Sequence, residues 1–112
     1  MILEIIYTNV LEKIGKMSKF NVYAGLSGGF GGASFITTEE FKDEKEAWEY
    51  AYECAVEIYE SYAGYHGIRT VEDIMEEDEV DESEAIEIYQ EEMEGWIDYY
   101  AILTSEDKET VK

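Results

Sequence analysis

Apolar and polar positions alternate in two stretches near the start of the chain, over residues 20–26 and again over residues 33–38. A period of two is typical of β-strands with one buried face. Between the two stretches lies the sequence Ser-Gly-Gly-Phe-Gly-Gly, residues 27–32, whose glycines can adopt positive φ. The pattern predicts a β-hairpin whose connection is longer than a two-residue turn.

The spacing of apolar residues then changes to a helical period. Asp43 followed by Glu46 resembles a capping box, and Gly64 is a natural residue just beyond a helix end, so we predict a helix over residues 44–63. The face that we expect to be buried contains Ala47, Ala51, Cys54, Ala55, Ile58 and Tyr62. Cys54 is the only cysteine. We expect it to be a small buried hydrophobe, and it cannot form an internal disulfide.

Two further capping patterns predict a short helix over residues 71–78 and a longer one over residues 82–97. The apolar face of the longer helix contains Ala85, Ile86, Tyr89, Met93, Trp96 and Ile97. Residues 99–104 predict a closing strand. We therefore expect an α+β fold, in which the hairpin and the C-terminal strand form a small antiparallel sheet, and two main helices and a short one cover one face.

A single acidic domain is expected over residues 17–104. Met17 begins a second start-like segment, so we interpret residues 1–16 as an N-terminal appendage, and we expect the charged tail, residues 105–112, to fray. No stretch approaches the 18 apolar residues of a membrane span. Glu4 interrupts the first apolar run and no cleavage site follows, which argues against a signal peptide. We expect a cytoplasmic protein.

The net charge of −20 is distributed unevenly. Residues 1–42 carry four acidic and four basic side chains, whereas residues 43–112 carry the other 24 acidic side chains and only four basic ones. Such a surface repels nucleic acids and anionic membranes, and it attracts basic protein surfaces, including those that bind DNA or RNA. We therefore expect neither direct nucleic-acid binding nor membrane association.

Acidic residues recur at helical spacing on faces other than the apolar ones. The glutamates that we expect to contact a partner are Glu49, Glu53, Glu57 and Glu60 of the first helix and Glu84, Glu87, Glu91 and Glu94 of the last. Carboxylates at this spacing rise about 4.5–6 Å per step, comparable with the phosphates of duplex DNA at about 3.4 Å. Like-charged neighbours destabilise a helix, so their retention suggests a function, with DNA mimicry as the hypothesis. The alternative is an acidic, solvated surface that mimics nothing.

The glycine-rich loop is the most unusual local feature. The residues that we single out are Phe30 and the glycines around it, Gly28, Gly29, Gly31 and Gly32. A phosphate cradle would need a following helix and usually a lysine, and the sequence predicts neither here. Two interpretations stay open: a mobile hairpin loop, or a binding loop that displays Phe30 at its tip.

His66 is the only histidine and lies in the loop expected after the first long helix, beside Tyr65 and close to Arg69. One histidine makes neither a catalytic triad nor a zinc site. The acidic run over residues 76–84 lacks the alternating ligands and the glycine of an EF-hand loop. We therefore expect no enzymatic activity, no cofactor and no metal site. A small-molecule or nucleotide site built from the glycine-rich loop, Tyr65, His66 and Arg69 is an alternative.

Three segments together resemble a group of small uncharacterised phage and prophage proteins: NVYAGLSGGFGGA (21–33), ESYAGYHGIRT (60–70) and GWIDYY (95–100). The resemblance covers roughly residues 17–104, and residues 1–16 depart from it. It implies no activity, but it implies an accessory protein in a bacterial host cytoplasm, where such proteins often inhibit host defences. We therefore predict an acidic phage protein that binds and inhibits a host nucleic-acid-binding defence protein. The alternatives are an interaction module that uses the glycine-rich loop and a small-molecule-binding protein.

Overall fold

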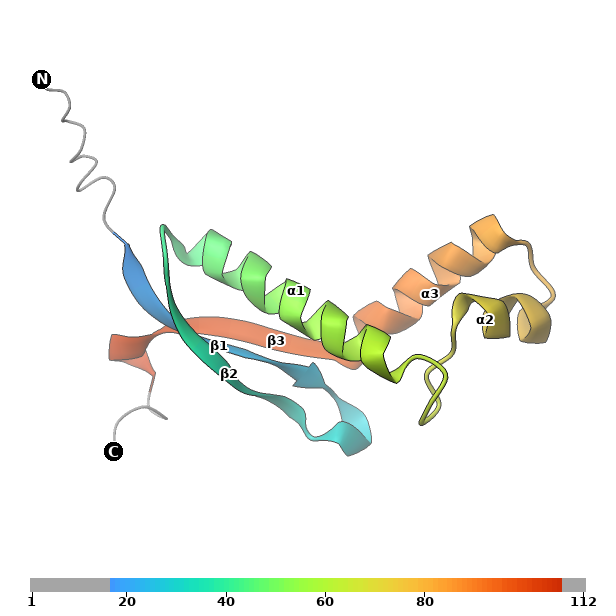
Figure 1. The fold of residues 1–112 in the computed structure, drawn as a ribbon, viewed down its shortest axis with the longest axis horizontal. Helices are drawn as coiled ribbons and strands as arrows, with labels where there is room; N and C mark the ends of the chain where they lie inside the picture. Colours follow the sequence, from blue (N-terminus) through green and yellow to red (C-terminus); the bar gives the residue numbers. More distant parts are fainter. Residues whose placement is uncertain (1–16, 108–112) are drawn as a thin grey trace, which may run out of the picture.

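A computed structural model describes residues 17–107 of the chain (Figure 1). The elements are β1 (Ser18–Leu26), a 3-10 turn η1 (Gly28–Phe30), β2 (Gly32–Phe41), α1 (Glu44–Tyr62), α2 (Val71–Asp78), α3 (Glu82–Trp96), β3 (Ile97–Leu103) and a second 3-10 turn η2 (Thr104–Glu106). This arrangement confirms the expected α+β fold. The segment interpreted as an appendage, residues 1–16, and residues 108–112 of the expected tail lie outside the described residues.

The three strands form one antiparallel sheet in the order β2-β1-β3. β1 is the central strand: Leu26 pairs with Gly32 of β2 on one side and with Ile97 of β3 on the other. A bulge between Val22 and Tyr23 shifts the register of β1 against β2. The C-terminal strand therefore adds to the hairpin, as the sequence predicted.

The helices are arranged differently from the single covering layer that we expected. α1 lies across one face of the sheet, whereas α2 and α3 pair with each other beyond the C-terminal end of α1 (Figure 1). The reason is the junction of α3 with β3, because the helix ends at Trp96 and the strand begins at Ile97 with no loop between them. Without a turn that reverses the chain, α3 continues past the end of the sheet and does not fold back over it.

α1 packs on the sheet through small residues spaced four apart. Ala47, Ala51 and Ala55 are fully buried, and Tyr59 continues the same stripe. Their small side chains let the helix approach the sheet closely. Our expected face was shifted slightly, because it omitted Tyr59 and included Cys54, which is only half-buried. In α3, Ala85 and Met93 are buried as expected, but Ile86 is 45% exposed.

The opposite face of the sheet carries a cluster of polar contacts around Asp107. The Asn21 side-chain amide (2.8 Å) and the Tyr23 hydroxyl (2.6 Å) both donate hydrogen bonds to Oδ2 of Asp107, which is 5% exposed. The turn η2 places Asp107 there. Residues 105–107 therefore belong to the fold, which differs from the frayed tail that we expected to begin at residue 105.

Candidate partner-binding surface

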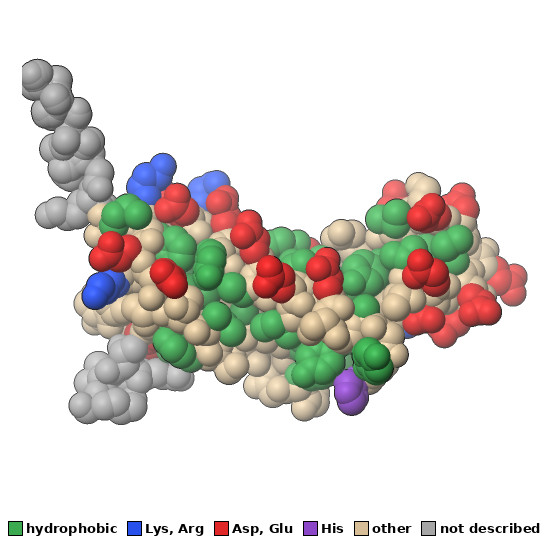
Figure 2. Space-filling model, viewed as in Figure 1, with side chains coloured by type: hydrophobic (Ala, Val, Ile, Leu, Met, Phe, Trp, Pro, Cys, Tyr) green, Lys and Arg blue, Asp and Glu red, His purple; other side chains and the backbone are tan. Residues whose placement is uncertain are grey.

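The eight glutamates that we expected to contact a partner are all exposed. Figure 2 shows acidic side chains in a line over α1 and in a dense group over α2 and α3 on the same view of the molecule. Basic side chains in this view lie at the opposite end, where β1 and α1 begin. The acidic side chains thus form two groups on the same side of the molecule, one along α1 and one over α2 and α3, with uncharged side chains between them (Figure 2).

The acidic side chains are favourable at the N-terminal ends of the helices and unfavourable at their C-terminal ends. Acidic residues near a helix N-terminus interact favourably with the helix dipole, and Glu44 and Glu46 lie in the first turn of α1. None of the three helices carries a basic residue in its last turn, where one would be stabilising. Within the described residues, α1 forms one ion pair, the exposed contact between Lys45 and Glu49 (2.6 Å). Outside its cap, its first turn and this pair, the acidity of α1 therefore has no stabilising ionic partner within residues 17–107.

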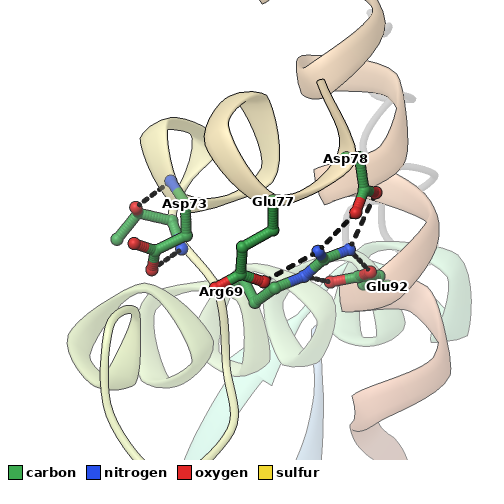
Figure 3. A network of polar contacts seen from close by, with 6 residues as sticks. Arg69, Asp73, Glu77, Asp78 and Glu92 are labelled. Atoms are coloured by element: carbon green, nitrogen blue, oxygen red, sulfur yellow. Dashed lines mark hydrogen bonds and ion pairs between the residues drawn. The ribbon is translucent and has the colours of Figure 1, made fainter. Parts of the chain in front are cut away.

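Arg69 is the exception, because it neutralises carboxylates of both α2 and α3, the helix pair that forms the outer arm of the molecule. Its guanidinium contacts Glu77 (3.2 Å) and Asp78 (3.0 and 3.3 Å) of α2, and it forms two hydrogen bonds with Glu92 of α3 (Figure 3). These carboxylates, Glu92 foremost, raise the pKa of Arg69, and the hydrogen bond from Arg69 lowers the pKa of Asp78. The five contacts match the five N–H donors of arginine. Arg69 therefore joins α2 to α3 and has no donor left for a ligand.

The glycine-rich loop is packed and does not project. Phe30 is half-buried, and its ring lies against the rings of Tyr62 (centroids 4.9 Å apart), Trp96 (5.7 Å) and His66 (6.0 Å). The backbone N–H of Ser27 donates to the carbonyl of Trp96 (2.8 Å), which fixes the loop to the end of α3. Phe30 is therefore packed against its own domain, and the interpretation that the loop displays it at its tip is wrong.

Two features of the loop explain its glycines. Gly31 and Gly32 have φ of 96° and 87°, the left-handed region that favours glycine. Gly25 of β1 lies between Asp98 of β3 and Ala33 of β2. Because Gly25 has no side chain, the Asp98 side chain reaches across the central strand and accepts a hydrogen bond from the Ala33 N–H (2.9 Å). The motif therefore has a structural role in closing the hairpin.

The structure brings His66, but not Arg69, to the glycine-rich loop. Gly29, Phe30, His66 and Trp96 line an open cleft of about 410 Å³. His66 has φ of 57°, and the neighbouring Tyr65 is 64% exposed. Gly28 packs near the Trp96 ring, since a β-carbon there would lie 3.5 Å from it. This cleft contains no carboxylate partner for His66, so its chemistry is that of an aromatic surface.

A second aromatic surface was not singled out from the sequence. Trp48 and Tyr52 of α1 and Tyr99 of β3 line an open groove of about 440 Å³, together with Lys45, Glu49 and Glu53. The Tyr99 ring lies edge-on to Trp48 (6.0 Å, 72°) and to Tyr52 (5.4 Å, 75°). In the sequence, the only indication of this groove is the i,i+4 spacing of Trp48 and Tyr52 between the glutamates. The third ring, Tyr99, is 47 residues from Tyr52, so the sequence alone did not place it there.

No group of three or more histidine, cysteine, aspartate or glutamate residues within 17–107 is arranged to hold a metal ion. Over the same range, every helix is too short or too polar to cross a membrane. Comparisons with protein-family models, curated proteins and solved structures found no significant match to this chain. The functional argument therefore depends on the residues themselves.

Proposed function

We propose that this protein binds a basic surface of a host nucleic-acid-binding protein and blocks that surface against nucleic acid. The observation that carries the proposal is the acidic surface over α1, α2 and α3, whose eight named glutamates are all exposed (Figure 2). Its setting is that of a phage accessory protein in a bacterial cytoplasm, as the resemblance over residues 17–104 implies.

The electrostatics of the helices support a binding role for the charge. Like-charged pairs at i,i+4 destabilise a helix by a few tenths of a kcal/mol each, and acidic residues in the last turn oppose the dipole. A surface that only kept the protein in solution would be better served by charges of both signs. Because the sequence retains this unfavourable pattern on all three helices, an external basic surface is the natural counterpart.

In the proposed mechanism, this protein occupies the basic groove of its partner. The acidic side chains along α1 and over α2 and α3 would lie in that groove in place of the sugar-phosphate backbone (Figure 2). Long-range attraction would speed association, and added salt would slow it. Specificity would then come from the short-range contacts made once the surfaces meet.

The proposal is tested by capture of partners from a bacterial host lysate with paired charge-reversal variants. Glu87→Lys with Glu91→Lys changes two exposed glutamates of α3, and Glu39→Lys with Glu40→Lys makes the same change of charge on exposed residues of β2. We expect the α3 variant to lose a basic nucleic-acid-binding partner at low salt and the β2 variant to keep it. Retention of the partner by both variants, or in 1 M salt, would contradict the proposal.

A second candidate function is suggested by the cleft at Gly29, Phe30, His66 and Trp96. It would make the protein an interaction module that uses the glycine-rich loop, with the acidity serving only solubility. Substitution of His66 by alanine removes an exposed ring from this cleft. Loss of the partner in this variant, together with full binding by the α3 charge-reversal variant, would favour this candidate over the first.

A further inference from the structure

The groove between α1 and the edge strand β3 leaves costly apolar surface in contact with water. Trp48 is 39% exposed although it is one of only two tryptophans, and Tyr52 and Tyr99 are half-buried beside it. The rings are not packed face to face, because Tyr99 meets both of the others edge-on. The volume of about 440 Å³ is large enough to hold part of a side chain from another molecule.

The charges around these rings favour a cation. Glu49 and Glu53 line the groove, and Glu94 of α3 is held next to it because it accepts a hydrogen bond from the Tyr52 hydroxyl (3.1 Å). Aromatic faces carry partial negative charge and attract cations, as carboxylates do. Glu53 has no ion pair with any lysine or arginine of residues 17–107.

We propose that this groove receives an arginine side chain of the basic partner protein, an inference that rests on the proposed function. The planar guanidinium can stack on an aromatic ring and bond to a carboxylate at the same time, and it is less strongly hydrated than an ammonium group. The groove thus supplies both contacts from neighbouring residues. It adds a specific anchor to an acidic surface that would otherwise attract basic proteins without discrimination.

Lys45 competes with the incoming arginine. Its ammonium group pairs with Glu49 at the mouth of the groove, and its side chain is 82% exposed. An exposed ion pair of this kind contributes little and is easily replaced. An arginine that enters the groove therefore displaces Lys45 from Glu49, and removal of the lysine charge will strengthen binding.

A direct test uses N-acetylarginine methylamide as the probe and the two indole N–H signals of the ¹⁵N-labelled protein as the readout. We expect saturable shifts of the Trp48 signal with a Kd of about 1–10 mM. The Trp96 indole, which lies outside the groove against Phe30, serves as the internal control. The uncharged analogue N-acetylcitrulline methylamide should leave Trp48 unchanged. Equal shifts with both probes, or no shift of Trp48, would overturn the proposal.

Three variants separate a local site from the general field of the protein. Glu53→Gln should weaken binding of the arginine probe about two- to five-fold, and Lys45→Gln should strengthen it. Glu40→Gln is the matched control, since it removes the same charge from an exposed residue of β2 that does not line the groove. Equal weakening by Glu53→Gln and Glu40→Gln would show attraction without a site and would contradict the proposal.

Binding of the captured partner protein to variants shows whether the arginine site or the proposed function is wrong. Trp48→Ala should weaken binding of the captured partner without removing any charge. If charge reversal on α3 releases the partner and Trp48→Ala does not, the proposed function stands and the arginine site is wrong. If the arginine probe binds at Trp48 but no basic partner is captured, the site stands and the proposed function is wrong.

Discussion

At the scale of single residues, Gly25 is the clearest case of a position that accepts no side chain. A β-carbon on Gly25 would lie 2.4 Å from the carbonyl oxygen of Gly32, which is backbone of the paired strand. We expect Gly25→Ala to lower the free energy of unfolding by about 1–3 kcal/mol. Gly29 is the matched control, because a β-carbon there meets nothing within 4 Å. Urea unfolding measures both variants, and equal losses of stability would refute this explanation of the motif.

Tyr59 carries a polar group that the fold does not satisfy. Its side chain is fully buried, and its hydroxyl has no hydrogen-bond partner among the described residues. An unsatisfied buried group is costly, so Tyr59→Phe should raise the free energy of unfolding by about 1 kcal/mol. Tyr65→Phe, at an exposed tyrosine, should change it little. A destabilised Tyr59→Phe variant would show that the hydroxyl has a partner after all.

The same residue predicts a pH dependence. Burial raises the pKa of Tyr59 to about 12, whereas a tyrosine in the unfolded chain has a pKa of about 10. Between these values the unfolded chain has lost the proton and the folded chain has kept it, so stability falls as pH rises through this window. Unfolding free energies measured across it should fall less steeply for Tyr59→Phe than for the wild type. Parallel pH profiles would contradict the assignment.

At the scale of elements, Arg69 is the tie within the outer helical arm. Arg69→Gln would leave Glu77, Asp78 and Glu92 close together without their cation, so their mutual repulsion should separate α2 from α3 (Figure 3). We expect faster amide hydrogen exchange in α2 and α3, while α1 and the sheet keep their protection. Lys45→Gln, which breaks an exposed ion pair, is the control. Unchanged exchange in Arg69→Gln would show that apolar contacts alone hold the arm.

Acid should loosen the same arm. The hydrogen bond from Arg69 lowers the pKa of Asp78 below its ordinary value of 3.8, so this ion pair stabilises the fold above that value and is lost as pH falls through the lowered pKa.

The bounds of the elements were predictable because the signals are local. Asp43, Thr70 and Asp81 each accept a hydrogen bond from the backbone N–H three residues later, as their sequence patterns indicated. The relative placement of the helices was not predictable, because the absence of a loop at Trp96–Ile97 carries no periodic signal. For the same reason, the packing of Phe30 and the groove at Tyr99 depend on contacts between residues distant in sequence.

At the scale of the whole molecule, the charge gives salt two opposite effects. Salt screens repulsion between the exposed carboxylates, so the melting temperature of the free protein should rise between about 0.05 and 0.5 M NaCl. Over the same range, attraction to a basic partner should weaken. Thermal unfolding and binding can be measured in the same buffers. A melting temperature that falls with salt would show that the acidic helices do not repel one another.

The central claim is that the acidic surface takes the place of nucleic acid on its partner. The most direct measurement is competition, in which fluorescence anisotropy follows labelled DNA or RNA bound to the captured partner while this protein is added. We predict stoichiometric release of the nucleic acid by the wild type and by Glu39→Lys with Glu40→Lys, and no release by Glu87→Lys with Glu91→Lys. A ternary complex, in which the partner holds the nucleic acid and this protein together, would contradict the claim.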